Sequence, residues 1–224
     1  MSSASPALKA QDKPIVFVVD DDVSVRESLE LLIQFAGWQP ETFASAEEFR
    51  ARPRVLTPNC LVLDISLPDL NGLELQKLIA TDRTDMPIIF ITGHGDVPMT
   101  VQAMKGGAVE FLTKPIDDDA LLSAIGNAIK RSAAALDEQT ELQALRDCYA
   151  SLTPREREVM RLVVSGMLNK QIGLKLGITE ITVKAHRGKM MQKMKADSVA
   201  DLVKIAVKLG LTPARNPWHV LREH

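Results

Sequence analysis

Acidic residues directly follow two short apolar runs of this chain, a placement that suits metal binding and phosphoryl transfer. Asp20 and Asp21 follow residues 15–19, and Asp64 follows residues 60–63. Runs this short and apolar are typical of buried parallel strands, whose carboxyl ends meet at one edge of a sheet. Carboxylate oxygens gathered there are the ligands that Mg²⁺ prefers, and one carboxylate can accept a phosphoryl group. We therefore expect the three aspartates to bind Mg²⁺ and Asp64 to form an aspartyl phosphate.

Two more predicted strands supply the other groups that a phosphoryl site needs. Thr92 ends the apolar run 88–92, and Lys114 comes shortly after residues 108–112. A lysine gives positive charge to phosphoryl oxygens, and a threonine hydroxyl can donate a hydrogen bond to one of them. The backbone carbonyl of Ser66 is a further expected ligand, since Mg²⁺ prefers octahedral oxygen coordination. Taken alone, residues 20–22 could simply cap a helix, Asp64 is more often a turn aspartate and Lys114 a solvated lysine. Their recurrence at four strand ends favours a functional site.

These residues meet only if residues 14–131 form one sheet. Short apolar runs alternate there with amphipathic stretches, which predicts an α/β domain with a doubly wound, five-stranded parallel sheet covered on both faces. Ligands of such sheets bind beyond the carboxyl ends of the strands. The predicted strands are 15–19, 40–43, 60–63, 88–92 and 108–112, and the predicted helices are 23–36, 46–50, 73–81, 98–105 and 118 onward.

A second, all-α domain is predicted for residues 152–211. Thr153, Pro154 and Glu156 have the spacing of a capped helix start. Four helices follow, at 154–165, 169–176, 180–195 and 198–209, and the second and third read as a helix-turn-helix. The remaining segments are an unstructured N-terminus at 1–13, a helical linker at 132–151 and a tail at 212–224.

The charge of the chain is divided between these domains. The net charge is −8 through Lys130 and +8 from Ser151 to His224. A basic helix-turn-helix fits the major groove of DNA, where phosphate contacts supply affinity and base edges supply specificity. Ile181, Met190 and Met194 are expected to face the core of the domain. The predicted base contacts are Lys184, Ala185 and Arg187, and the predicted phosphate contacts are Lys170, Thr179 and Lys193.

Other features bound the class of protein. No segment has the apolar length of a membrane span and residues 1–13 lack the core of a secretory signal, so a cytoplasmic protein is expected. Cys60 and Cys148 are expected to be free thiols, because two distant cysteines make no disulfide scaffold. The linker permits either a rigid helical spacer or a helix that pairs with a partner chain.

Residues 14–131 resemble the receiver domain of two-component response regulators. The resemblance lies in Val-Val-Asp-Asp-Asp, Leu-Val-Leu-Asp, Ile-Thr-Gly and Leu-Thr-Lys-Pro, and residues 93–96 and 104–111 further resemble the FixJ branch. It implies that a sensor histidine kinase phosphorylates Asp64 and that Mg²⁺ binds at Asp20 and Asp21. It also implies switching contacts by Thr92 and Lys114, a rotating aromatic gate at Phe111, and a cis bond between Lys114 and Pro115.

Residues 152–211 resemble the LuxR-type helix-turn-helix domain, through Leu-Thr-Pro-Arg-Glu-Arg-Glu-Val, Asn-Lys-Gln-Ile and Ile-Thr-Val-Lys-Ala-His-Arg. That family binds DNA as dimers. The two resemblances together imply a phosphorylation-activated transcription regulator of the FixJ/NarL type, with homodimerisation on phosphorylation, promoter DNA as a partner and RNA polymerase as a further one. No enzymatic activity is expected beyond its own Mg²⁺-dependent phosphorylation and dephosphorylation.

Two other classes of function remain open from the residues alone. A haloacid-dehalogenase type enzyme also uses an aspartyl nucleophile with Mg²⁺, but its nucleophile usually follows the first strand, whereas Asp64 follows the third. A regulator could instead act on RNA or protein, or work without phosphate. The complete acidic pocket argues against a receiver that needs no phosphate.

Overall fold

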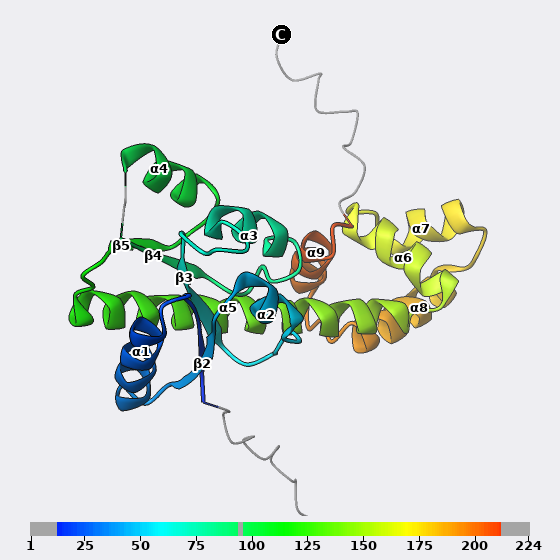
Figure 1. Ribbon diagram of the computed structural model, residues 1–224. Coiled ribbons are helices and arrows are strands. Elements are labelled where there is room, and N and C mark those ends of the chain that lie inside the picture. The colour runs from blue at the N-terminus through cyan, green and yellow to red at the C-terminus, as the bar shows by residue number, and fades with distance from the viewer. Residues whose placement is uncertain (1–12, 94–95, 212–224) are drawn as a thin grey trace, which may run out of the picture. The chain divides into compact units, whose positions relative to one another are not determined.

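The computed structural model describes residues 13–93 and 96–211, and the chain forms two compact units, one through Asp137 and one from Glu138. The predictions for residues 1–12 and for the tail 212–224 lie outside the described residues. The first unit is a sheet with helices on both faces, and the second is helical (Figure 1). The strands of the first unit are β1 (Ile15–Val19), β2 (Gln39–Phe43), β3 (Asn59–Asp64), β4 (Ile88–Thr92) and β5 (Glu110–Thr113). Its helices are α1 (Val23–Phe35), α2 (Ala46–Ala51), α3 (Gly72–Ile79), α4 (Val97–Lys105) and the start of α5 (Asp118–Ala150).

The sheet confirms the predicted doubly wound architecture. Its strand order is β2-β1-β3-β4-β5, and every neighbouring pair is parallel. The order reverses between β1 and β3, so β1 and β3 lie side by side at the switch point where such folds bind ligands. Val19 pairs with Leu63, which brings the residues that follow β1 next to Asp64 at the end of β3.

Alternate residues of the strands pack against different helices. Phe17, Leu61 and Phe90 belong to a buried cluster with α2, α3 and α4. Val18, Val62 and Ile91 belong to a second buried cluster with α1 and α5. Because both faces are covered, the central strands β1, β3 and β4 are apolar on both sides, and their polar side chains lie at the strand ends.

The fifth strand starts two residues later than predicted. Ala108 donates its backbone N–H to the carbonyl of Ala103, 3.2 Å away, and Gly107 has φ +95°. These residues therefore close the turn after α4, and the ladder with β4 begins at Glu110. Apolarity alone placed Ala108 in the strand, although its small buried side chain serves the turn equally well.

The second unit contains α6 (Pro154–Val164), α7 (Asn169–Leu176), α8 (Glu180–Lys193) and α9 (Val199–Lys208). The capping box forms as predicted: Glu156 accepts from the backbone of Thr153, and Thr153 caps α6 in return. A core cluster that includes Val159, Ile172 and Met190 lies between these helices.

Helix α5 runs without a break through the predicted linker. Ser132 is fully buried, and its hydroxyl accepts a hydrogen bond of 3.0 Å from the backbone of Asn59 at the start of β3. Packing of the first unit therefore continues past residue 131. Among the residues that the structure describes, no helix, α5 included, combines the length and apolarity needed to cross a membrane.

Helix α3 begins directly against the end of β3. A Cβ on Gly72 would lie 2.6 Å from the carbonyl oxygen of Asp64 and 3.2 Å from the Phe90 ring. Asn71 caps the helix by accepting from the backbone of Leu73. The absence of a side chain at Gly72 is thus what allows α3 to start beside Asp64.

Gly72→Ala should lower the free energy of unfolding of the first unit by about 1–3 kcal/mol, because the new methyl group overlaps backbone that cannot move freely. Gly126→Ala is the matched control. Its Cβ would meet only Trp38, at 4.0 Å, and alanine raises helix stability by about 1 kcal/mol over glycine.

The measurement is urea denaturation followed by Trp38 fluorescence in a Trp218→Phe background. An effect of Gly72→Ala that is no larger than that of Gly126→Ala would contradict the close approach.

Candidate functional site

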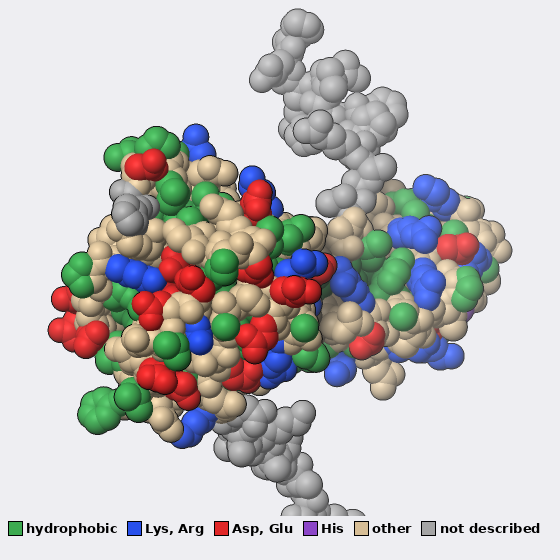
Figure 2. Space-filling view, viewed as in Figure 1, with side chains coloured by type: hydrophobic (Ala, Val, Ile, Leu, Met, Phe, Trp, Pro, Cys, Tyr) green, Lys and Arg blue, Asp and Glu red, His purple; other side chains and the backbone are tan. Residues whose placement is uncertain are grey.

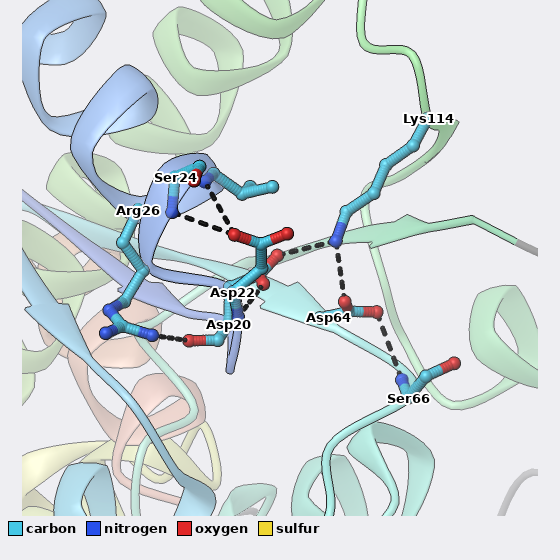
Figure 3. A network of polar contacts seen from close by, with 8 residues as sticks. Asp20, Asp22, Ser24, Arg26, Asp64, Ser66 and Lys114 are labelled. Carbon is cyan, nitrogen blue, oxygen red and sulfur yellow. Dashed lines mark hydrogen bonds and ion pairs between the residues drawn. The ribbon is translucent and has the colours of Figure 1, made fainter.

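The centre of the candidate site is the ammonium group of Lys114, which lies between two aspartates (Figure 3). Its Nζ is 2.7 Å from Oδ2 of Asp20 and 2.7 Å from Oδ2 of Asp64. The three residues come from the loops and strand ends after β1, β3 and β5. The predicted convergence of Asp20, Asp64 and Lys114 is thus present in the structure.

Backbone groups fix the other oxygen of each aspartate. Oδ1 of Asp64 accepts from the N–H of Ser66 at 3.0 Å, and Oδ1 of Asp20 accepts from the N–H of Asp22 at 2.9 Å. Arg26 donates to the carbonyl of Asp20 at 2.6 Å and so anchors the loop to α1. Both carboxylates therefore keep their second oxygen directed toward Lys114 (Figure 3).

Burial and charge act in opposite directions in this pocket. The side chain of Asp20 is fully buried, and this burial raises its carboxyl pKa despite the opposing hydrogen bond and charge of Lys114. Burial would lower the pKa of Lys114, but its hydrogen bonds to Asp20 and Asp64 outweigh that effect and raise the pKa. Lys114 is therefore charged at neutral pH and partly neutralises the pocket.

The donor set fits a hard cation. One carboxylate oxygen from each of Asp20, Asp21 and Asp64 lies within 4.8 Å of the others. Asp20 and Asp64 are buried, whereas Asp21 is exposed, which leaves one open side for water and a phosphoryl group. Ser66, whose carbonyl was predicted as a further ligand, follows Asp64 closely and is held to it through its N–H.

Thr92 and Phe111, the other two predicted switch residues besides Lys114, lie on the neighbouring strands β4 and β5. Thr92 is fully buried at the end of β4, and its carbonyl accepts from the backbone of Lys114 at 2.8 Å. Phe111 lies on β5, half-buried against the cluster formed with α2, α3 and α4. The Lys114–Pro115 peptide bond is cis, as the family resemblance implied.

The second candidate site is the exposed surface of α7 and α8. Gly173 allows the turn between the two helices to pack closely against α7, because a Cβ there would lie 2.7 Å from the carbonyl oxygen of Ile178. Thr179 caps α8 by accepting from the backbone of Thr182. The predicted contacts Lys170, Thr179, Lys184 and Ala185 are all exposed.

The other two predicted contacts are engaged within the domain. Arg187 is half-buried and donates to Oδ1 of Asn169 on α7 at 3.0 Å. Lys193 forms an ion pair of 2.6 Å with the buried Glu156. That ion pair holds the pKa of Glu156 below its usual range, with help from its hydrogen bond to Thr153. A lysine held in this way is a poorer phosphate contact than an unpaired one.

The prediction that Ile181 faces the core is wrong. Ile181 is 79% exposed, while Val183, Met190 and Met194 fill the core side of α8. Helical periodicity explains why Ile181 is exposed: it is two residues from the buried Val183, and residues at this spacing do not share a face of a helix. Its apolar character alone suggested burial.

Several residues that matter to the sites carry no strong sequence signal. Arg26 and Gly72 position the acidic pocket through backbone contacts that depend on how α1 and α3 meet the sheet. The Glu156–Lys193 pair joins α6 to α8 across 37 positions. Only the capping pattern that includes Glu156 could have singled out one of these residues.

The distribution of charge agrees with two sites of opposite sign. Asp and Glu gather on the visible face of the sheet-containing unit, and Lys and Arg predominate on that of the helical unit (Figure 2). The carboxylates suit a cation and the basic surface suits a polyanion.

Comparisons with known protein families cover both units. Residues 16–126 match the response regulator receiver domain, and residues 150–206 match the luxR family of bacterial regulatory proteins. Nodulation protein W of Bradyrhizobium diazoefficiens is 47% identical over 204 residues, which are 91% of this chain and 90% of that protein. Transcriptional regulatory protein FixJ of the same bacterium is 39% identical over 196 residues, 88% of this chain and 96% of that protein.

Solved structures support the same similarity. The structure of the response regulator StyR is 46% identical, with a TM-score of 0.79, and the match covers 88% of this chain and 100% of StyR.

Lys114→Met should make the stability of the first unit more dependent on pH in the absence of divalent cations. Loss of the lysine raises the pKa of buried Asp20 further. A raised pKa stabilises the fold at low pH, and this contribution is lost as the pH rises through the folded pKa. The variant's deficit in urea midpoint against the wild type should therefore be larger at pH 7.5 than at pH 5.

The double variant Lys114→Met/Asp20→Asn is the control and should lose this extra pH dependence. A deficit of equal size at both pH values would show that the electrostatic account of Lys114 and Asp20 is wrong.

Proposed function

Since the chain belongs to the two-component response regulators of the FixJ type, which join a receiver domain to a LuxR-type DNA-binding domain, we propose that Asp64 is its phosphoryl acceptor. The protein is a phosphorylation-activated transcription regulator. The observation that carries the assignment of Asp64 is its position at the switch point of the sheet, with Lys114 at 2.7 Å and one oxygen fixed by Ser66.

The donor is the phosphohistidine of a sensor histidine kinase. An Asp64 oxygen attacks the phosphorus, the P–N bond breaks, and its electron pair stays on the imidazole, so that the product is an aspartyl phosphate. Lys114 moves its hydrogen bond from the carboxylate to a phosphoryl oxygen and neutralises part of the added charge. The N–H of Ser66 keeps the acceptor carboxylate oriented.

Asp20, Asp21 and Asp64, with the backbone carbonyl of Ser66, would hold Mg²⁺. When bound, the ion neutralises the repulsion between the anionic acceptor and the anionic donor. The support is the cluster of three carboxylates with one exposed member, Asp21.

The phosphoryl group adds about −1.5 to −2 charges at the end of β3. Thr92 and Lys114, on the two neighbouring strand ends, move toward it, and Phe111 turns inward from its half-buried position on β5. The surface of α4 and β5 is thereby reshaped, and the receiver dimerises. A full switch from 1:99 to 99:1 requires about 5.5 kcal/mol of differential stabilisation.

The output is binding of promoter DNA by α7 and α8. Lys170 and Thr179 contact phosphates, and Lys184 and Ala185 lie on the exposed face that enters the major groove. Arg187 can contact a base edge only if its hydrogen bond to Asn169 breaks. Lys193 can contact a phosphate only if its ion pair with Glu156 breaks. RNA polymerase is the proposed further partner, and the cytoplasm the proposed location.

We propose the domain limits 14–131 for the receiver, 132–151 for the helical linker and 152–211 for the DNA-binding domain. The uninterrupted helix α5 and the cap at the start of α6 support the linker and the last boundary.

The local geometry disfavours the alternative of a haloacid-dehalogenase type enzyme, which would use two aspartates, two residues apart, after the first strand. Asp22, two residues after Asp20, accepts from the backbone of Ser24 and Val25 and caps α1. It is thus occupied as a helix cap, and the acceptor role falls to Asp64.

Asp64→Asn should abolish labelling of the full chain by radioactive acetyl phosphate, because the amide is no nucleophile for phosphorus. Asp22→Asn is the matched control and should label normally, since asparagine caps helices as well as aspartate does. Full labelling of the Asp64 variant would sink the assignment.

The same assay tests the metal. A chelator should suppress labelling of the wild type, and Asp21→Asn should shift its Mg²⁺ dependence to higher concentration. Labelling that is unchanged by the chelator would exclude the proposed metal site.

Two lysines of the helical unit should behave differently. Lys170→Ala should weaken binding to all duplex sequences alike and lower the slope of log affinity against log salt by about 1, as loss of one phosphate contact requires. Lys193→Ala should instead destabilise the domain by about 1–2 kcal/mol, because buried Glu156 loses its partner.

Binding is measured with the phosphorylated full chain by fluorescence anisotropy, and stability by calorimetry. Unchanged unfolding of the Lys193 variant would contradict the structural role of that lysine.

A further inference from the structure

The outermost face of α8 carries no charge. Ile181, Ala185 and Gly188 follow one another at spacings of four and three residues, so they form one stripe along the helix. All three are exposed, and Ile181 is 79% exposed. Buried Val183 and Met190 lie on the opposite side, against the core of the domain.

Charged residues flank this stripe instead of occupying it. Lys184 and Lys189 are exposed on its two sides. The ammonium of Lys184 forms an ion pair of 3.1 Å with the carboxylate of Glu180, one turn earlier. An ordinary solvated helix would place its charges farthest from the core. Here that position is held by an isoleucine and two of the smallest residues.

The small residues leave the helix backbone open to a close approach. A Cβ added to Gly188 would meet no atom within 4 Å, and Ala185 adds only a methyl group. A single exposed isoleucine needs no explanation by itself. Ile181, however, lies at the centre of the outer face, in the first turn of the second helix of a helix-turn-helix. This position requires an explanation.

We propose that Ile181 contacts the C5-methyl group of a thymine in the major groove and so contributes to the sequence preference of the protein. This inference rests on the proposed DNA-binding function. The first residues of such a helix meet base edges, and the thymine methyl is the apolar group that the major groove presents. Ala185 and Gly188 let α8 enter deeply, while the exposed Lys184 and Lys189 flank Ile181 on either side.

The probe is a duplex enriched from a random-sequence library by the phosphorylated full-length protein. Each thymine of this duplex is replaced in turn by uracil, which removes only the methyl group. At one position per half-site the replacement should weaken wild-type binding about fourfold, the loss expected for one buried methyl group.

Ile181→Ala should show no such penalty at that position, whereas Lys184→Ala should retain it. Because Ile181 is exposed, its alanine variant should unfold at the wild-type temperature, and this is checked by calorimetry. A fourfold penalty that persists in Ile181→Ala, or the absence of any penalty in the wild type, overturns the thymine contact alone. Failure of the wild type to enrich any sequence overturns both this contact and the proposed DNA-binding function.

Discussion

The receiver site depends on one electrostatic constraint, the placement of a single lysine between two buried carboxylates. Asp20 and Asp64 end up side by side because β1 and β3 are neighbours at the switch point of the sheet. Two carboxylates in such a position repel each other and resist burial. Lys114, carried by the loop after β5, offsets this repulsion with two contacts of 2.7 Å.

This arrangement links the chemistry of the pocket to the shape of the domain. The backbone N–H of Lys114 donates to the carbonyl of Thr92. The lysine that forms an ion pair with Asp64 therefore also connects the ends of β4 and β5. Phe111 lies three residues before that lysine on β5 and is only half-buried, which leaves it room to change its packing. Charge added at Asp64, as proposed, would therefore act on a residue that already connects the pocket to β5.

In the helical unit, residue type does not indicate which side chains hold the helices together and which are exposed on the surface. Lys193 and Arg187 are basic, yet their contacts with Glu156 and Asn169 hold α8 to its neighbours. Ile181 is apolar, yet it lies on the outside. Charge and hydrophobicity counted along the chain do not distinguish these roles, because both depend on which face of α8 the core occupies.

The class of the fold, the order of the elements and the residues of the acidic pocket could all be predicted from the sequence. The central strands are buried on both faces of the sheet, so each is a short apolar run with its polar residues at the ends, as at Asp64 and Thr92. The contacts between elements that are distant in the chain could not be predicted in this way, because they depend on how the elements pack. The close approach at Gly72, the outward position of Ile181 and the Glu156–Lys193 pair are of this kind. Periodicity predicts that a helix has a buried face, but packing against other helices selects that face.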